Sequence, residues 1–95
     1  MIIKIKENQF TIYDGQGREI LQRNEHHTEP LPMALCSVLE GFNRINRWDK
    51  DEGTFEFCVK DHMGVILATS VEYPNIESRE KDIKYLATIS SSFTY

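Results

Sequence analysis

Apolar and polar residues alternate along residues 54–60, which is the pattern of a strand whose two faces meet different surroundings. The apolar side is predicted to hold Phe55, Phe57 and Val59. The side predicted to face water holds Thr54, Glu56, Cys58 and Lys60. A Gly-containing turn at 61–64 and β-branched residues over 65–71 then predict a hairpin. With a short strand at 47–49 and a turn at 51–53 before it, the second half is expected to form a three-stranded meander.

Two segments have helical spacing. Pro74 ends the strands, and Asn75 is a suitable N-cap for a helix expected over residues 76–90. Its inner stripe is predicted as Ile83, Leu86, Ala87 and Ser90, helped by Ile76. The side chains predicted to stay in water are Glu77, Arg79, Glu80, Lys81 and Lys84.

The first half has the stronger helical signal. A helix is expected to begin near Pro32, and its apolar stripe is Leu35, Val38, Leu39, Phe42 and Ile45. Gly41 lies inside this stripe, where glycine costs about 1 kcal/mol relative to alanine in an exposed helix. We therefore expect another backbone to approach closely at Gly41.

The chain also resembles itself. A shift of 47 positions places Phe10, Ile12, Asp14 and Gly17 on Phe57, Val59, Asp61 and Gly64. With one extra residue, Glu19, Ile20-Leu21 then falls on Ile66-Leu67. Both stretches follow one plan of strand, turn, strand, Pro-containing loop and helix. The sequence therefore predicts one domain, 1–95, built from two repeats at about 1–46 and 47–90, with a frayed tail at 91–95.

The run from Phe55 to Tyr73, with Ile83 ten residues further on, resembles the repeat of the YegP-like family of small bacterial proteins of unknown function. That repeat reads F-x-F-x-L, then N-G-x-V-I-x-x-S-x-x-Y, then a capped helix bearing G-I. This chain has Met63 for the Asn, Asn75 for the capping Ser and Asp82 for the helical Gly, which the first repeat keeps as Gly41. The first repeat is also about five residues longer in its loop.

The resemblance implies an α+β fold. Two tandem β-β-β-α repeats would form one antiparallel sheet with both helices packed on one face, and the repeats would exchange their helices across it. Because a two-repeat chain completes this arrangement alone, a monomer is expected. The resemblance implies no catalytic residues.

Composition and charge narrow the function. Ninety-five residues allow one domain and exclude a separate cofactor module. The net charge of -4 disfavours nucleic acid, because there is no excess of cations to release counterions. The chain has no apolar run long enough for a signal peptide or a membrane span. Cys36 and Cys58 are expected to be free thiols, which fits a cytoplasmic protein.

Candidate catalytic groups are sparse. Adjacent His26 and His27 diverge on a helix or strand, so a metal site is not expected and the loop is interpreted as solvated. Cys58 has no neighbour that would lower its pKa. The acidic residues Asp49, Asp51, Glu52 and Asp61 are interpreted as a solvated rim with ordinary pKa values. We therefore expect no catalytic site and no cofactor.

The remaining candidate surface is the sheet face without helices. Its predicted residues are Tyr13, Trp48, Glu56, Cys58 and Lys60. Exposed Tyr and Trp favour a protein partner, so the chain is interpreted as a small noncatalytic binding or interaction module. Single-stranded nucleic acid or a small ligand on the same face is the alternative, and an enzyme is the least favoured class.

Overall fold

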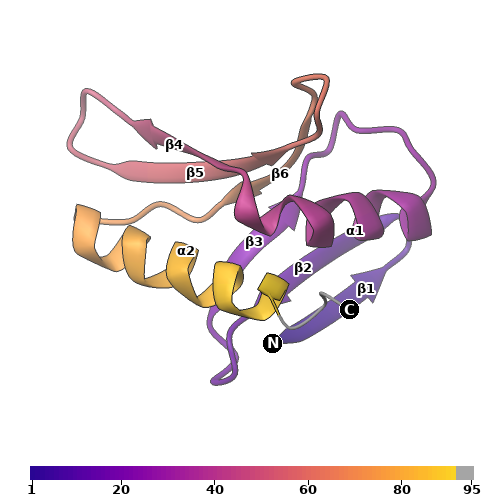
Figure 1. Cartoon of the computed structure of the whole chain (residues 1–95), viewed down its shortest axis with the longest axis horizontal. Coiled ribbons are helices and arrows are strands. Elements are labelled where there is room, and N and C mark those ends of the chain that lie inside the picture. The colour runs from indigo at the N-terminus through magenta and orange to yellow at the C-terminus, as the bar shows by residue number, and fades with distance from the viewer. Residues whose placement is uncertain (92–95) are drawn as a thin grey trace.

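The computed structural model describes residues 1–91 and contains one six-stranded antiparallel sheet with two helices (Figure 1). Its strands are β1 Ile2–Lys6, β2 Gln9–Tyr13, β3 Glu19–Arg23, β4 Ile45–Asp49, β5 Phe55–Lys60 and β6 Ile66–Ser70. Their order in the sheet is β1-β2-β3-β6-β5-β4, so β3 and β6 meet in the centre and β1 and β4 form the edges. The predicted α+β class and single antiparallel sheet are confirmed.

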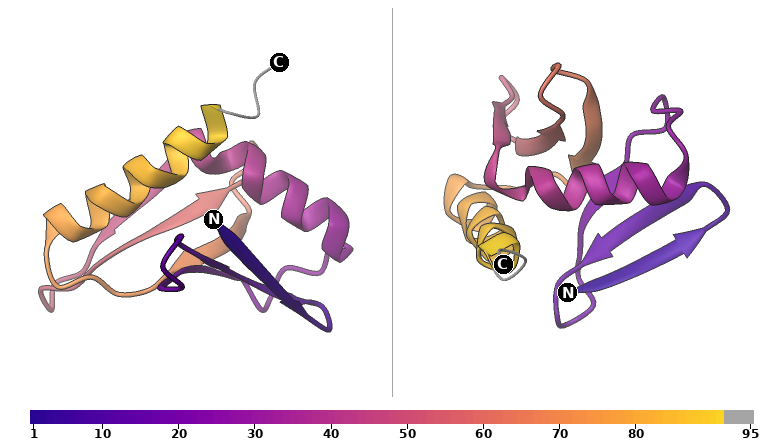
Figure 2. Two further views of the ribbon diagram at one scale, coloured as in Figure 1. Left: turned by 90° about the horizontal axis from the view of Figure 1, so that it is seen from below. Right: turned by 45° about the vertical axis from the view of Figure 1, so that its right-hand side comes forward.

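Both helices lie on one face of the sheet (Figure 2). Helix α1 spans Leu31–Glu40 and continues into a 3₁₀ turn, Gly41–Asn43, whereas α2 spans Ile76–Ser91. The predicted N-cap is confirmed, because Oδ1 of Asn75 accepts the N–H of Ser78 at 2.8 Å. Of the tail predicted at 91–95, Ser91 ends α2 and the rest lies outside the described residues.

The core lies between the sheet and the helices. Helix α1 packs on β6, whereas α2 packs on β5 and on the 3₁₀ turn. The largest fully buried side chains include Phe10, Phe42, Phe57, Ile12 and Leu86. Alternation along β2 and β5 explains the contribution of Phe10, Ile12 and Phe57, because every second side chain of each strand points at the helices. The helix-free face is left to the other side chains.

Gly41 fits closely against β5. A Cβ placed on Gly41 would lie 2.5 Å from Cγ1 of Val59 and 3.6 Å from the carbonyl oxygen of Lys60. The close approach expected here is therefore made mainly with a stiff core side chain rather than with another backbone. Helix α1 also ends before its predicted stripe does, because Ile45 is the first residue of β4.

At the centre of the sheet, β3 of the first half pairs with β6 of the second, and the matching residues of the two strands are separated by 47 positions with no insertion. Gln22 pairs with Thr69, Leu21 with Ser70 and Arg23 with Ala68. Adding 47 to Leu21, Gln22 and Arg23 gives residues 68, 69 and 70. If each residue is replaced by its match in the other half, the same three pairs result. The extra residue placed at Glu19 in the sequence comparison is therefore wrong. Both halves have a register shift at the matching place, between β2 and β3 in the first half and between β5 and β6 in the second, so neither half has a residue that the other lacks there.

The polar face predicted for α2 needs one correction. Arg79 is only 4% exposed, although it was expected to stay in water. Its guanidinium lies over the ring of Phe55, 5.5 Å from the centroid, and contacts the carboxylate of Asp49. Arginine can be buried in this way because its donors are met by a carboxylate and a carbonyl while its plane stacks on an aromatic ring.

Candidate functional site

The predicted surface residues share the helix-free face but do not form one cluster. Trp48 pairs with Glu56 across β4 and β5, and Cys58 pairs with Thr69 across β5 and β6. Tyr13 lies on β2, on the far side of the sheet centre. Three strands, β3, β6 and β5, lie between β2 and β4 in the sheet. Tyr13 and Trp48 are therefore too far apart to form one aromatic surface.

Two of these residues are not exposed. Glu56 is 9% exposed and Cys58 has no exposed surface, so their predicted contact with water is wrong. Nζ of Lys50 contacts the carboxylate of Glu56, and Trp48 lies opposite Glu56 in register. Burial raises the pKa of the Cys58 thiol. Alternation assigns a side chain to a face, but cross-strand neighbours decide whether that side chain meets water.

A polar hollow of about 350 Å³ lies where β2, β3 and β6 meet. The polar residues that line it are Gln9, Thr11, Gln22, Asn24, Glu25 and Thr69. The central pair Gln22 and Thr69 belongs to this lining, so the hollow is on the helix-free face. Beside it, Nζ of Lys4 lies 5.0 Å from the centroid of the Tyr13 ring. This hollow was not expected from the sequence.

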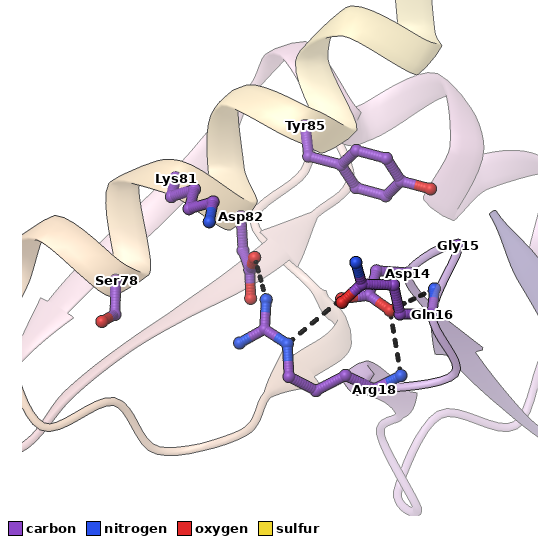
Figure 3. A pocket seen from close by; sticks show the side chains of 8 residues that line it. All are labelled: Asp14, Gly15, Gln16, Arg18, Ser78, Lys81, Asp82 and Tyr85. Carbon is purple, nitrogen blue, oxygen red and sulfur yellow. Dashed lines mark hydrogen bonds and ion pairs between the residues drawn. The ribbon is translucent and has the colours of Figure 1, made fainter.

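A second hollow, of about 380 Å³, lies between the β2–β3 turn and α2 (Figure 3). Its lining is Asp14, Gly15, Gln16, Arg18, Ser78, Lys81, Asp82 and Tyr85. The turn supplies the first four of these residues, and successive turns of α2 supply the other four. Figure 3 shows Arg18 extending from the turn toward Asp82 on the helix.

Four side chains form a chain of polar contacts at this cleft. The Tyr73 hydroxyl donates to Oδ2 of Asp82 at 2.7 Å, and Nη2 of Arg18 donates to Oδ1 of Asp82 at 2.6 Å. Nε of Arg18 also donates to Oδ2 of Asp14 at 3.1 Å. Asp82 is only 3% exposed, and these two hydrogen bonds give each oxygen of its buried carboxylate a donor. The contacts join the first half of the chain to α2 of the second.

The pKa shifts in this chain of contacts favour a structural role. The backbone N–H of Arg18 holds the pKa of Asp14 below its ordinary value. Burial, followed by the hydrogen bond to Asp82, raises the pKa of Tyr73 far above its ordinary value. Tyr73 therefore stays protonated and Asp14 stays ionised at neutral pH, so neither is poised to exchange a proton there. The contacts tie elements together rather than providing an acid or a base.

Sequence reasoning missed Asp82 as an inner residue of α2, although a signal exists. Residues 79, 82, 83 and 86 follow the i, i+3, i+4, i+7 spacing, so a stripe extended back from Leu86 includes Asp82. A carboxylate on that stripe requires a buried cation or hydroxyl partner. The sequence could have indicated the requirement, but not that Arg18 and Tyr73 meet it.

The histidine loop differs from the solvated loop that was expected. The His27 side chain is 9% exposed, and its Nε2 lies 3.3 Å from Oε2 of Glu29. Arg23 is also buried, and it donates to the carbonyl oxygens of Asn8, His27 and Glu29. Within the described residues, no group of three His, Cys, Asp or Glu side chains is arranged to hold a metal ion.

The remaining chemical candidates are placed as follows. Cys36 is exposed on α1 and Cys58 is buried on β5, and both thiols are free. Asp61 does not keep its ordinary pKa, because the backbone N–H of Val65 lowers it. No helix in the described part of the chain is long and apolar enough to cross a membrane.

Comparison with known proteins gives a fold. The fold is that of small α+β proteins of the YegP kind. The chain matches the solution structure of the protein of unknown function YegP from E. coli with a TM-score of 0.72 and 23% identity, over 82% of this chain and 71% of that one. It matches a UPF0339 protein from Shewanella oneidensis with a TM-score of 0.66 and 18% identity, over 86% and 75% of the chains.

The other two comparisons add no activity. No family model matches the chain, and no curated protein matches it. Both solved structures support the resemblance to the YegP-like family, and the protein from E. coli is described as one of unknown function.

Proposed function

We propose that this chain is a noncatalytic, cytoplasmic module that binds another protein through the helix-free face of its sheet. The observation that carries the proposal is the polar hollow at the centre of that face, lined by residues of β2, β3 and β6. Most of its lining consists of amide and hydroxyl groups, which both donate and accept hydrogen bonds. Such groups can bind backbone or side-chain polar groups of a partner without a strong charge of either sign.

Tyr13 supports the same surface. It is half-buried on β2, and the ammonium group of Lys4 lies over its ring. Rigid aromatic side chains lose little entropy on binding, which is why Tyr is enriched in protein interfaces.

Site-specific photocrosslinking tests this surface. A photoreactive amino acid replaces Gln22 in the hollow, and a matched control carries it at Lys84, which is exposed on α2. We expect position 22 to capture a defined protein that position 84 does not capture. The variant Thr11→Arg, which places a long cation in the hollow, should abolish the capture while leaving the fold unchanged.

Two results would contradict the proposal. One is the same set of captured proteins at both positions, which would indicate contact without a defined surface. The other is binding of single-stranded nucleic acid at low salt, where electrostatic attraction is strongest, because the partner would then be of another class.

Measurement of the molecular mass in solution tests the expected monomer.

A further inference from the structure

The two edges of the sheet differ in what covers them. At β4, the guanidinium of Arg47 pairs with Glu80 of α2 at 2.8 Å, and Arg79 of α2 donates to the Trp48 carbonyl oxygen at 3.4 Å. Within the described residues, β1 has a hydrogen-bonded neighbour on one side, β2, and lies at the open margin of the sheet (Figure 1). The outer side of β1 is therefore a strand edge that no strand among residues 1–91 occupies.

The side chains of β1 give this edge a definite chemical character. Ile2 and Ile5 are 40% and 54% exposed, and Lys4 and Lys6 are exposed too. By alternation, both lysines lie on the helix-free side, whereas Ile3 and Ile5 lie on the helix side. No acidic residue occurs in β1, although the whole chain carries a net charge of -4. The helix-free side of the edge thus carries both lysines, with Ile2 at its start, and the helix side is apolar.

We propose that β1 is a strand-addition site for an extended acidic segment of another protein, in which Asp or Glu alternates with apolar residues. In an antiparallel ladder, alternate residues of an edge strand point their N–H and C=O groups outward. An added strand would pair with those groups. Its acidic side chains would then lie beside Lys4 and Lys6, and its apolar side chains beside Ile3 and Ile5.

Charge selects this occupant over a second copy of the chain. Two β1 strands paired antiparallel about Lys4 would place the two Lys4 side chains directly opposite each other on one face. Like charges opposite each other in a sheet are unfavourable, so the lysines keep two copies apart. The same lysines attract an acidic strand. The proposal rests on the proposed function in one respect, that the partner is a protein, but it concerns the edge of β1, which adjoins the hollow, and not the hollow itself.

Amide NMR with defined peptides tests the proposal. The probe is a short peptide that alternates Glu and Val, and the matched control replaces each Glu with Lys. We expect the Glu peptide to shift the β1 amide signals and to slow their hydrogen exchange, while the Lys peptide does neither. A Glu peptide with N-methyl groups on the edge that faces β1 should not bind, because it lacks the donors for strand pairing.

Charge reversal in the protein sharpens the test. The double variant Lys4→Glu with Lys6→Glu should weaken binding of the Glu peptide by about tenfold or more and should now bind the Lys peptide. Lys84→Glu is the control on α2, away from the edge and from the helix-free face, and should leave both affinities unchanged. The amide spectrum of each variant shows directly that its fold is retained.

Equal binding of the two peptides, no protection of β1, or an unchanged preference in the double variant would each overturn the proposal. These outcomes leave the open-face proposal standing, because that surface is tested at Gln22. Conversely, the loss of a defined capture at Gln22 would not alter the peptide result at β1.

Discussion

In the β2–β3 turn and the β5–β6 turn, an aspartate carboxylate accepts two backbone N–H groups in the same way. Oδ1 of Asp14 accepts from Gln16 and Arg18 at 2.9 Å each, and Oδ1 of Asp61 accepts from Met63 at 2.8 Å and Val65 at 2.9 Å. Each turn also has a glycine with positive φ, 85° in one and 87° in the other. Glycine adopts this region without steric cost.

The turns differ in the residue that follows the glycine. Arg18 reaches α2 and pairs with the buried Asp82, whereas Val65 at the matching position is 46% exposed. Helix α1 also offers no acid to a cation in the second turn, since its only acidic residue, Glu40, is exposed at its end. Local hydrogen bonds therefore set the shape of both turns, and one side chain determines which turn is tied to a helix.

The largest expected effect on stability comes from removing Asp82, the buried carboxylate that pairs with Arg18. Asp82→Ala leaves the Tyr73 hydroxyl and part of the Arg18 guanidinium without a partner, so we expect a loss of about 2–3 kcal/mol in the free energy of unfolding. Urea denaturation measures it. A double-mutant cycle with Arg18→Ala should be non-additive, and additive losses would contradict a direct coupling.

Tyr73→Phe tests the inner end of the same contacts, with an expected loss of about 1 kcal/mol at neutral pH. The pKa of Tyr73 is raised, so its stabilising contribution is complete below the ordinary value of 10.0 and is lost as the pH rises above it. The wild type should therefore lose its advantage over Tyr73→Phe in alkali. Urea midpoints on both sides of this pH check the sign, and a constant difference would contradict it.

Acid titration compares the two turns directly. The pKa values of Asp14 and Asp61 are both lowered, so their contributions are present above the ordinary value of 3.8 and are lost as the pH falls. We expect Asp14→Asn and Asp61→Asn each to flatten the acid side of the stability curve. Asp14→Asn should flatten it more, because Asp14 also pairs with Arg18. Equal curves would show that the ion pair adds nothing.

The smallest expected effect on stability comes from placing an arginine in the β5–β6 turn, at the position that matches Arg18. Val65→Arg places the side chain of the first turn in the second, where α1 has no matching acid. We expect a change within about 0.5 kcal/mol, as for most surface substitutions. Thermal and urea unfolding measure it, and a stabilisation well beyond this range would indicate a partner that α1 does not supply.

Much of the fold could be predicted from the sequence because its signals are local. The alternation over 54–60, the glycine turns and the Asn75 cap each depend on near neighbours in the chain, and the structure has all three. The stripe of α1 was extended too far, into Ile45, because a strand that begins with an apolar residue satisfies the same spacing.

The candidate site was less predictable. Glu56, Cys58 and Arg79 were all expected in water and are all buried. In each case the covering group comes from elsewhere in the chain: Lys50 for Glu56, the neighbouring strands for Cys58, and Phe55 with Asp49 for Arg79. Periodicity assigns a side chain to a face, but it carries no information about what lies opposite that face.

The sequence by itself determined the alternating strand over 54–60, the two glycine turns and, from residues 10–17 and 57–64, the separation of 47 residues between matching positions. These features follow from side-chain alternation and from backbone conformations that few residues adopt. Only the tertiary structure decided that Arg18 meets Asp82, that the open face has a polar hollow over β2, β3 and β6, and that β1 lies at an edge of the sheet. Each of these depends on which distant residues the sheet brings together, and contacts between distant residues leave no periodic signal in the chain.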